Sequence, residues 1–381
     1  MVFYDFWKGV FAILNLHKNR RKKKTYVLDY WLVLVIVFLM LIGLILLYST
    51  SSYNGRVRFQ DSAYYFKKQI FAAILGIICM YVVANIDYHW FVKAAPYCYM
   101  VSIVLSTFVL FIGDEYNGSK RWLSLGPLSF QPAELAKLSV VLFVTWIICK
   151  SDKKHGFGLI CKVLFLVFPI VGLVGSNNLS TAVIILGIAI LLIFISDPHY
   201  MQFIGLGVAC VSFLAIFLAM ESYRLERLAV WRNPEAYEKG FQTLQGLLAI
   251  GSGGLFGNGL GNSMQKLGFV PEAQNDMIFS IICEEFGLIG SFFVILLFAI
   301  LIYRLFRIAM GYIDLEGCLI VSGIMTHIAL QVILNIAVVT NTIPNTGITL
   351  PFISYGGTSV LFLLSEMGLA ISVSRFSHRR D

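Results

Sequence analysis

The chain has 381 residues, of which 58% are hydrophobic and only 13% charged, and its mean hydropathy is +0.81. One soluble core cannot hide so much apolar surface, so the composition excludes an ordinary water-soluble enzyme and indicates a protein whose main solvent is lipid. The net charge of +8 suits the basic loops that orient membrane proteins and requires no nucleic-acid partner.

The chain begins with a basic segment, residues 1–26, in which positive charges concentrate between residues 18 and 24. The aromatic and aliphatic residues before these charges fit either a helix lying along the membrane interface or a stretch without fixed structure. The apolar run that starts at Val27 is too long for the hydrophobic part of a cleaved signal peptide, so we expect it to remain as the first span.

Long apolar runs then recur along the whole chain. In hydrocarbon only helices and closed barrels pair all their backbone polar groups, and these runs are too long for barrel strands. We therefore predict an all-α polytopic membrane protein of about ten transmembrane helices, with one membrane domain over 27–374 and a short tail over 375–381. The expected spans are 27–48, 69–86, 92–112, 133–149, 161–176, 179–196, 201–220, 277–303, 315–339 and 358–374.

An even number of spans places both termini on the same side. Basic residues precede the first span and follow the last, so the positive-inside rule predicts that this side is the cytoplasm. Three polar loops then lie outside, at about 113–132, 221–275 and 341–357, and the largest joins spans seven and eight. Because these loops keep aromatic residues such as Trp122 and Trp231, we expect them to fold over the mouth of the bundle rather than to be disordered.

The second outer loop contains the glycine-rich run GSGGLFGNGLGN at 251–262. A dinucleotide-binding fingerprint would have to follow a strand and open a crossover helix, and this region offers no parallel sheet. Two interpretations remain open. The run is either a turn between two re-entrant or interfacial helices, or a nest of backbone N–H groups for an anionic ligand.

Charged residues at unusual places indicate a candidate site. Basic residues in the outer loops, among them Arg121, Arg224 and Arg227, are either scattered solvated charges or forked donors for a pyrophosphate or lipid phosphate. Glu134 and Lys137 lie three residues apart just inside the fourth span, so they share one helix face. They can pair with each other or contact a bound substrate.

Two further polar features lie on later spans. His327, Gln331 and Asn335 mark one face of the ninth span at four-residue spacing, where interhelical hydrogen bonding is the ordinary explanation. Asp276 stands where the long outer loop enters the eighth span. There it either caps the helix and meets the positive end of its dipole, or acts as a general base, which must be ionised to accept a proton.

Several segments resemble the signature segments of the shape, elongation, division and sporulation (SEDS) glycosyltransferases, and the resemblance covers nearly the whole chain and its ten-span layout. After GNSMQKL, the VPEA segment is more similar to the FtsW and SpoVE branch than to RodA. The matching segments are GSKRWLSLGPLSFQPAELAKL, GFQTLQGLLAIGSGGLFGNGLGNSMQKLGFVPEAQNDMIF, EEFGLIG and TGITLPFISYGGTS.

The resemblance implies a peptidoglycan glycosyltransferase that polymerises lipid II into glycan strands at the outer face of the bacterial cytoplasmic membrane, during division or sporulation. It implies inverting transfer with Asp276 as the base and undecaprenyl pyrophosphate as the leaving group. The expected substrate-binding residues are Arg121, Glu134, Lys137, Arg224, Arg227, Gln242, Gln265, Glu285, Ser354, Gly356 and Gly357.

The same resemblance implies lipid II as substrate and a class B penicillin-binding protein and other division or sporulation proteins as partners. A divalent cation, Mg²⁺ or Mn²⁺, could help to neutralise the pyrophosphate, yet the sequence shows no clear ligand set. None of the seven cysteines has a CxxC partner, so neither zinc nor a disulfide is expected.

This chain departs from the family pattern before its sixth span. The family usually has Pro-Asp-Phe-Gly-Thr where this sequence has Asn177-Asn178-Leu179-Ser180-Thr181, so a commonly acidic position is neutral. Two other classes of function remain. A lipid II flippase or transporter should carry ionisable groups through the full depth of the membrane, and a non-catalytic scaffold should tolerate loss of Asp276.

Overall fold

The computed structural model describes residues 29–116, 119–125, 128–151, 156–196, 228–311 and 314–376, together with Gly205 and Gly207. Within these residues nine helices are long and apolar enough to cross a membrane. Each coincides with an expected span, which confirms the all-α polytopic class. They are α2 (Tyr30–Phe59), α3 (Tyr64–Asn85), α4 (Tyr88–Ile112), α5 (Pro132–Lys150), α6 (Phe157–Asn177), α7 (Leu179–Ser196), α11 (Ile278–Gly311), α12 (Leu315–Val339) and α13 (Gly357–Phe376).

Some expectations fall outside the described residues. These are the span expected at 201–220, the proposed interfacial helix in the basic N-terminal segment, the side chains of Arg224 and Arg227, and the tail beyond residue 376.

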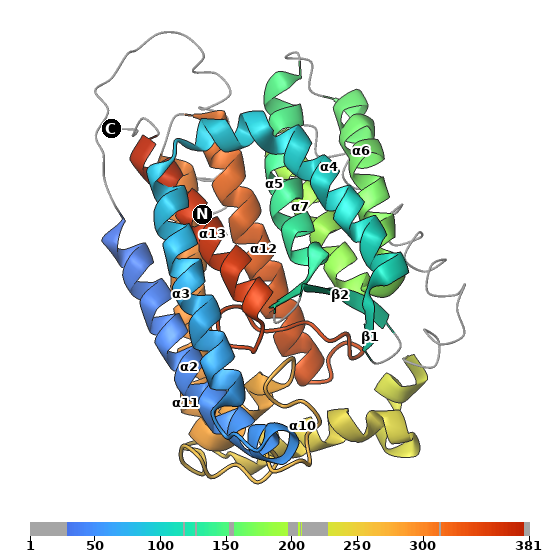
Figure 1. Ribbon diagram of the computed structural model, residues 1–381, viewed down its shortest axis with the longest axis vertical. Coiled ribbons are helices and arrows are strands. Elements are labelled where there is room, and N and C mark those ends of the chain that lie inside the picture. Colours follow the sequence, from blue (N-terminus) through green and yellow to red (C-terminus); the bar gives the residue numbers. More distant parts are fainter. Residues whose placement is uncertain are drawn as a thin grey trace.

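The spans form an elongated bundle whose long loops gather at one end (Figure 1). We call this the loop end. Helices α2, α3 and α11 lie on one side of the bundle and α4 to α7 on the other, with α12 and α13 between them. The buried faces of α5, α12 and α13 carry polar and charged groups, including Lys137, His327 and Glu366. Buried charge in a membrane protein is expensive, so these central helices are where a site is expected.

Helix α2 is longer than the sequence predicted. Asp29 caps its start by accepting a hydrogen bond from the Leu32 N–H at 3.0 Å, and Gln60 ends it in a left-handed conformation with φ of 56°. The expected span stopped at residue 48 because the following residues are polar. The helix nevertheless continues to Phe59, and its last turns contact the loop that precedes α11: the Asn54 amide donates to the Gln274 Oε1 at 2.9 Å, and the Arg58 Nη1 lies 3.8 Å from the Glu272 Oε1.

The first polar loop contains a small antiparallel sheet that the sequence did not predict. Its strands β1 (Asp114–Tyr116), β2 (Ser119–Leu125) and β3 (Leu128–Phe130) pair in the order β1-β2-β3. Two side chains tie it to the bundle: the Thr358 hydroxyl donates to the Ser129 carbonyl at 2.7 Å, and the Asn177 amide donates to the Lys120 carbonyl at 2.8 Å. The sheet therefore holds β2 at the ends of α6 and α13.

The glycine-rich run at 251–262 pairs with backbone groups that a break in α11 leaves without helical partners. After η1 (Pro234–Ala236), η2 (Glu238–Gly240) and α10 (Phe241–Ser252), the run lies along α11 where Gly287 has φ of 66° and ψ of −164°. At such a kink backbone groups lose their helical partners. The run supplies them, through Asn258 N–H to Glu284 carbonyl (2.9 Å), Gly259 N–H to Glu285 carbonyl (2.9 Å), Leu288 N–H to Gly254 carbonyl (2.9 Å) and Ile289 N–H to Leu255 carbonyl (3.2 Å).

This pairing decides between the two interpretations of residues 251–262. A Cβ on Gly257 would overlap the backbone of Glu285, so the glycines serve close backbone approach. Since the N–H groups of Asn258 and Gly259 are used inside the protein, they form no nest for an anion. The turn interpretation is supported, with one correction: the run begins in the last two residues of α10, but turns rather than a second helix connect it to α11.

Candidate active site

A cavity of about 790 Å³ opens at the loop end of the bundle. All three polar loops contribute to its wall, together with α5, α7 and α12. Of the residues expected to form the site, seven line this cavity: Arg121, Glu134, Lys137, Gln242, Asp276, Gly356 and Gly357. The fold therefore brings together groups that are up to 236 positions apart in the sequence numbering, from Arg121 to Gly357.

Asp276 lies in the last turn before α11 and is only partly buried. Removal from water raises the pKa of its carboxyl group to about 6, and the charge of Glu272 adds to this, whereas backbone N–H groups and Arg121 act in the opposite direction. The carboxylate is thus mostly ionised at neutral pH, yet basic enough to accept a proton. That combination is what a general base requires.

Arg121 on β2 faces the same point as Asp276. A Cβ added to Gly347 would lie 3.7 Å from the Asp276 Oδ2 and 3.8 Å from the Arg121 Nη1, so both charged groups lie beside this glycine. Gly347 has φ of +69°, which other residues rarely adopt. The Arg121 Nε donates to the Asn177 carbonyl at 3.0 Å, which orients the guanidinium group.

Glu134 and Lys137 do pair with each other in the first turns of α5. The Lys137 Nζ lies 2.9 Å from the Glu134 Oε1 and donates to the Gln331 Oε1 at 3.1 Å. The Glu134 Oε2 is buried and has no hydrogen-bond partner among the described residues. Because both residues line the cavity, this oxygen remains as an acceptor for a donor group of a bound molecule.

The polar face of α12 holds the site together. The Gln331 amide N–H donates to the Thr349 carbonyl at 3.0 Å. The Asn335 amide donates both to the Asp276 carbonyl at 2.8 Å and to the Ile348 carbonyl at 2.6 Å. The four-residue spacing was visible in the sequence, but its partners were not. These partners are carbonyl groups of loop residues as well as side chains on other helices.

Asn178, at the commonly acidic family position, also lines the cavity. Its side-chain oxygen accepts the Thr181 N–H at 3.2 Å, so it caps the start of α7. Asparagine caps a helix about as well as aspartate. The substitution therefore keeps the local fold and removes one negative charge from the cavity wall.

Three expected substrate-binding residues, Ser354, Gln265 and Glu285, do not line this cavity. The Ser354 hydroxyl accepts the Leu350 N–H at 2.8 Å and so stabilises its own loop. Gln265 belongs to the turn region beside α11, where its backbone carbonyl accepts the Val270 N–H. Glu285 is 1% exposed and its carboxylate is already bound by other side chains.

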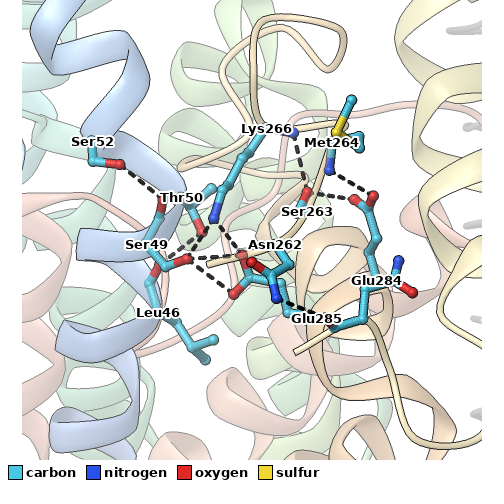
Figure 2. A network of polar contacts seen from close by, with 11 residues as sticks. Leu46, Ser49, Thr50, Ser52, Asn262, Ser263, Met264, Lys266, Glu284 and Glu285 are labelled. Atoms are coloured by element: carbon cyan, nitrogen blue, oxygen red, sulfur yellow. Dashed lines mark hydrogen bonds and ion pairs between the residues drawn. The ribbon is translucent and has the colours of Figure 1, made fainter. Parts of the chain in front are cut away.

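The groups that bind Glu285 form a buried polar cluster (Figure 2). The Lys266 Nζ lies 2.6 Å from the Glu285 Oε1, and the Ser49 hydroxyl of α2 donates to the same carboxylate at 2.8 Å. The adjacent Glu284 accepts hydrogen bonds from the Ser263 hydroxyl and, at 2.9 Å, from the Met264 N–H. Two consecutive carboxylates of α11 thus hold residues 263–266 against α2. Lys266 is one of the basic residues of the second outer loop, and here its charge is used inside the protein.

The residues present do not form a ready cation site. Among the described residues no three His, Cys, Asp or Glu side chains are grouped to hold a metal ion. The Glu134 carboxylate is paired with Lys137, and the Glu272 Oε2 accepts from the Asn275 amide at 2.8 Å. These carboxylates are thus engaged by other side chains and do not form a ligand set for Mg²⁺ or Mn²⁺.

Comparison with known proteins agrees with this arrangement. The family model for the FtsW, RodA and SpoVE cell cycle proteins matches residues 30–379. Stage V sporulation protein E of Bacillus subtilis (strain 168) is 37% identical over 358 residues, covering 92% of this chain and 97% of that protein. A probable peptidoglycan glycosyltransferase FtsW of Geobacter sp. (strain M18) is 33% identical over 353 residues, covering 91% and 96%.

Solved structures show the same fold. A chain from a study entitled "Structural coordination of polymerization and crosslinking by a peptidoglycan synthase complex" matches with a TM-score of 0.79 and 27% identity, covering 92% of this chain and 98% of that one. The rod shape determining protein RodA of Thermus thermophilus matches with a TM-score of 0.68 and 26% identity, covering 93% and 99%. The chain therefore belongs to the FtsW, RodA and SpoVE family of cell cycle proteins.

Proposed function

We propose that this chain polymerises lipid II into glycan strands, with Asp276 as the general base. It is a peptidoglycan glycosyltransferase, as its FtsW relatives are named. The observation that carries the mechanism is that Asp276 and Arg121 both lie beside Gly347 in a large cavity at the loop end. The cavity thus offers a base and anion-binding groups side by side.

The chemistry follows from these groups. The Asp276 carboxylate removes the proton from the 4-hydroxyl of one sugar as its oxygen attacks the anomeric carbon of another. The bond from that carbon to the pyrophosphate oxygen breaks, and undecaprenyl pyrophosphate leaves with the electron pair. Inversion results from attack opposite the leaving group. One carboxylate suffices because the pyrophosphate leaves without help from a carboxylic acid, unlike the sugar oxygen in glycoside hydrolysis.

Arg121 and Lys137 suit the negative charge of the pyrophosphate. Both are held in place by protein carbonyl or carboxylate groups, so little ordering is required when substrate binds. The unpaired Glu134 Oε2 can accept a hydrogen bond from a sugar hydroxyl or amide group. We assign these three residues to substrate binding and Asp276 to proton transfer.

A transporter is less consistent with the polar groups inside the bundle. From the cavity they reach His327 and Glu366, at the middles of α12 and α13. Between His327 and Glu316, near its other end, α12 carries no acidic or basic residue. A lipid II flippase would need polar groups through the full depth of the membrane, so polymerisation is the function that this arrangement supports.

The direct test is an assay with the purified chain and its expected partner, a class B penicillin-binding protein whose transpeptidase would crosslink the product. Incubation with lipid II should yield glycan strands that a muramidase digests. Transport of lipid II across vesicles without any polymer would contradict the proposal.

We further propose that both termini are cytoplasmic and that the cavity faces outward. In a variant without native cysteines, Lys239→Cys should react with a membrane-impermeant maleimide on intact cells. Ser151→Cys, between α5 and α6, should react only after the cells are opened. The reverse pattern would place the cavity on the cytoplasmic side and overturn the assignment of lipid II at the outer face.

Replacing Arg121 should weaken substrate use. We expect Arg121→Ala to lower kcat/KM by roughly 10- to 100-fold, because a hydrogen-bonded charged group contributes about 1.5–3 kcal/mol. The matched control is Arg307→Ala, since Arg307 is exposed near the opposite end of α11. Steady-state kinetics with lipid II distinguish the two variants, and equal activities would remove the anion-binding role of Arg121.

A further inference from the structure

A chain of buried polar side chains extends from the cavity into the middle of the bundle. It begins at Lys137, which lines the cavity, and continues through the Gln331 side-chain oxygen at 3.1 Å. The His327 Nε2 lies 2.8 Å from the same oxygen, and the His327 Nδ1 lies 2.8 Å from the Glu366 Oε2. All four residues are at most 2% exposed. The proposed mechanism uses only the first of them directly.

The geometry determines where the protons lie. The Gln331 amide nitrogen faces the Thr349 carbonyl, which can only accept, so the Gln331 oxygen is the atom that faces Lys137 and His327. His327 must therefore carry a proton on Nε2. Between Nδ1 and the Glu366 carboxyl group there is one further proton, donated either by the ring to a carboxylate or by a carboxylic acid to the ring.

Stability alone does not account for this pair. The Glu366 Oε1 is buried without a hydrogen-bond partner among the described residues. An ionisable residue at mid-span costs several times more free energy than an interhelical hydrogen bond returns. A polar contact between α12 and α13 could be made with less costly residues.

We propose that His327, held by Glu366, is a positioning residue that orients Gln331 and thereby fixes the anion-binding Lys137 and the Thr349 wall of the cavity. The Gln331 oxygen accepts from both Lys137 and His327, while its N–H group holds the Thr349 carbonyl at 3.0 Å. If His327 no longer donates, Gln331 loses one of the two contacts that fix its oxygen, and Lys137 loses a rigid partner. This inference rests on the proposed function because it assigns the cavity an anionic substrate.

Two near-isosteric substitutions separate the two sides of the histidine. In His327→Asn the amide nitrogen takes the place of Nδ1, so the contact with Glu366 survives and the contact with Gln331 is lost. In His327→Gln the amide nitrogen takes the place of Nε2, so the contact with Gln331 survives and Glu366 loses its partner. If His327 has a purely structural role, His327→Gln should lose more substrate binding than His327→Asn. If it is a positioning residue, His327→Asn should lose more.

The experiment measures equilibrium binding of undecaprenyl pyrophosphate to the purified full chain, the KM and kcat for lipid II, and the melting temperature. We expect His327→Asn to weaken binding and raise KM about tenfold, with kcat within about twofold, because one hydrogen bond in a charged network is lost and Asp276 is not touched. His327→Gln should bind like the wild type but melt at a lower temperature, since Glu366 is left buried and unpaired.

Unchanged binding in His327→Asn would overturn the inference, as would a loss that appears only in His327→Gln and follows its melting temperature. The binding of undecaprenyl pyrophosphate is measured at equilibrium and does not depend on catalysis. A wild-type chain that binds undecaprenyl pyrophosphate but makes no glycan in the presence of its expected partner would therefore contradict the proposed function, while the ranking of the two variants in binding would still decide the role of His327.

Discussion

Asp276→Asn should abolish polymerisation while leaving the fold intact. Asparagine has nearly the same shape as aspartate but cannot accept the proton of the attacking 4-hydroxyl. Loss of a general base typically costs 10²- to 10⁴-fold in rate. The decisive measurement is glycan synthesis from lipid II by a variant whose melting temperature and purified yield match the wild type. A variant that keeps more than about a tenth of the activity would show that Asp276 has only a structural role.

The pH dependence gives an independent check of the same residue. With a pKa of about 6, Asp276 loses its proton-accepting form as the pH falls below 6, so kcat/KM of the wild type should decline there. Ionisation of Asp276 affects the stability of the fold in the opposite direction to its effect on activity. Because the folded pKa lies above the ordinary value of 3.8, ionisation disfavours the fold as the pH rises from about 4 to 6. Asp276→Asn should therefore melt no lower than the wild type at pH 8.

Lys266→Met should produce the largest loss of stability. It leaves the Glu285 carboxylate buried with the Ser49 hydroxyl as its remaining donor among the described residues, and an uncompensated buried charge costs about 3–5 kcal/mol. For a protein of this size we expect a fall in melting temperature on the order of 10 °C. The matched control is Lys67→Met, because Lys67 pairs with Asp61 at 2.8 Å on the exposed surface, where solvent screens the pair and its loss should hardly change the melting temperature.

The double variant Lys266→Met/Glu285→Gln separates charge from packing. No charge remains unpaired, and the amide oxygen introduced at position 285 can still accept from Ser49, so we expect most of the stability to return. Thermal unfolding of Lys266→Met, Glu285→Gln and the double variant, each compared with the wild type, forms a complete double-mutant cycle. If the double variant is as unstable as Lys266→Met, then the lysine acts through packing of its chain and not through the ion pair.

The overall class of this protein follows from its sequence because the relevant physics is local. A backbone in lipid must pair its own polar groups, so each long apolar run becomes a helix, and nine expected spans appear as helices among the residues that the structure describes. The ends of the helices are harder to predict from the sequence, for the same reason. Polar residues after position 48 carry no hydrophobic signal, yet α2 continues to Phe59, and Asn54 and Arg58 there contact residues of the loop before α11.

The sequence predicted those parts of the candidate site that depend on the chemistry of single residues. Asp276, Arg121 and the Glu134 and Lys137 pair stand out because ionisable groups near helix ends and inside spans need a reason. Residue type alone could not separate them from Glu285 and Lys266. Those two look equally suited to a polar site, yet the fold joins them to each other 2.6 Å apart and away from the cavity.

Only the tertiary structure decided which groups meet. The glycine-rich run could have bound an anion, but α11 breaks at Gly287 and the run pairs with the backbone groups that the break releases. Likewise, the spacing of His327, Gln331 and Asn335 defines a helix face and leaves its partners open. Their partners, including Glu366 and the Asp276 carbonyl, lie on other segments, and contacts between distant segments depend on packing that no local pattern encodes.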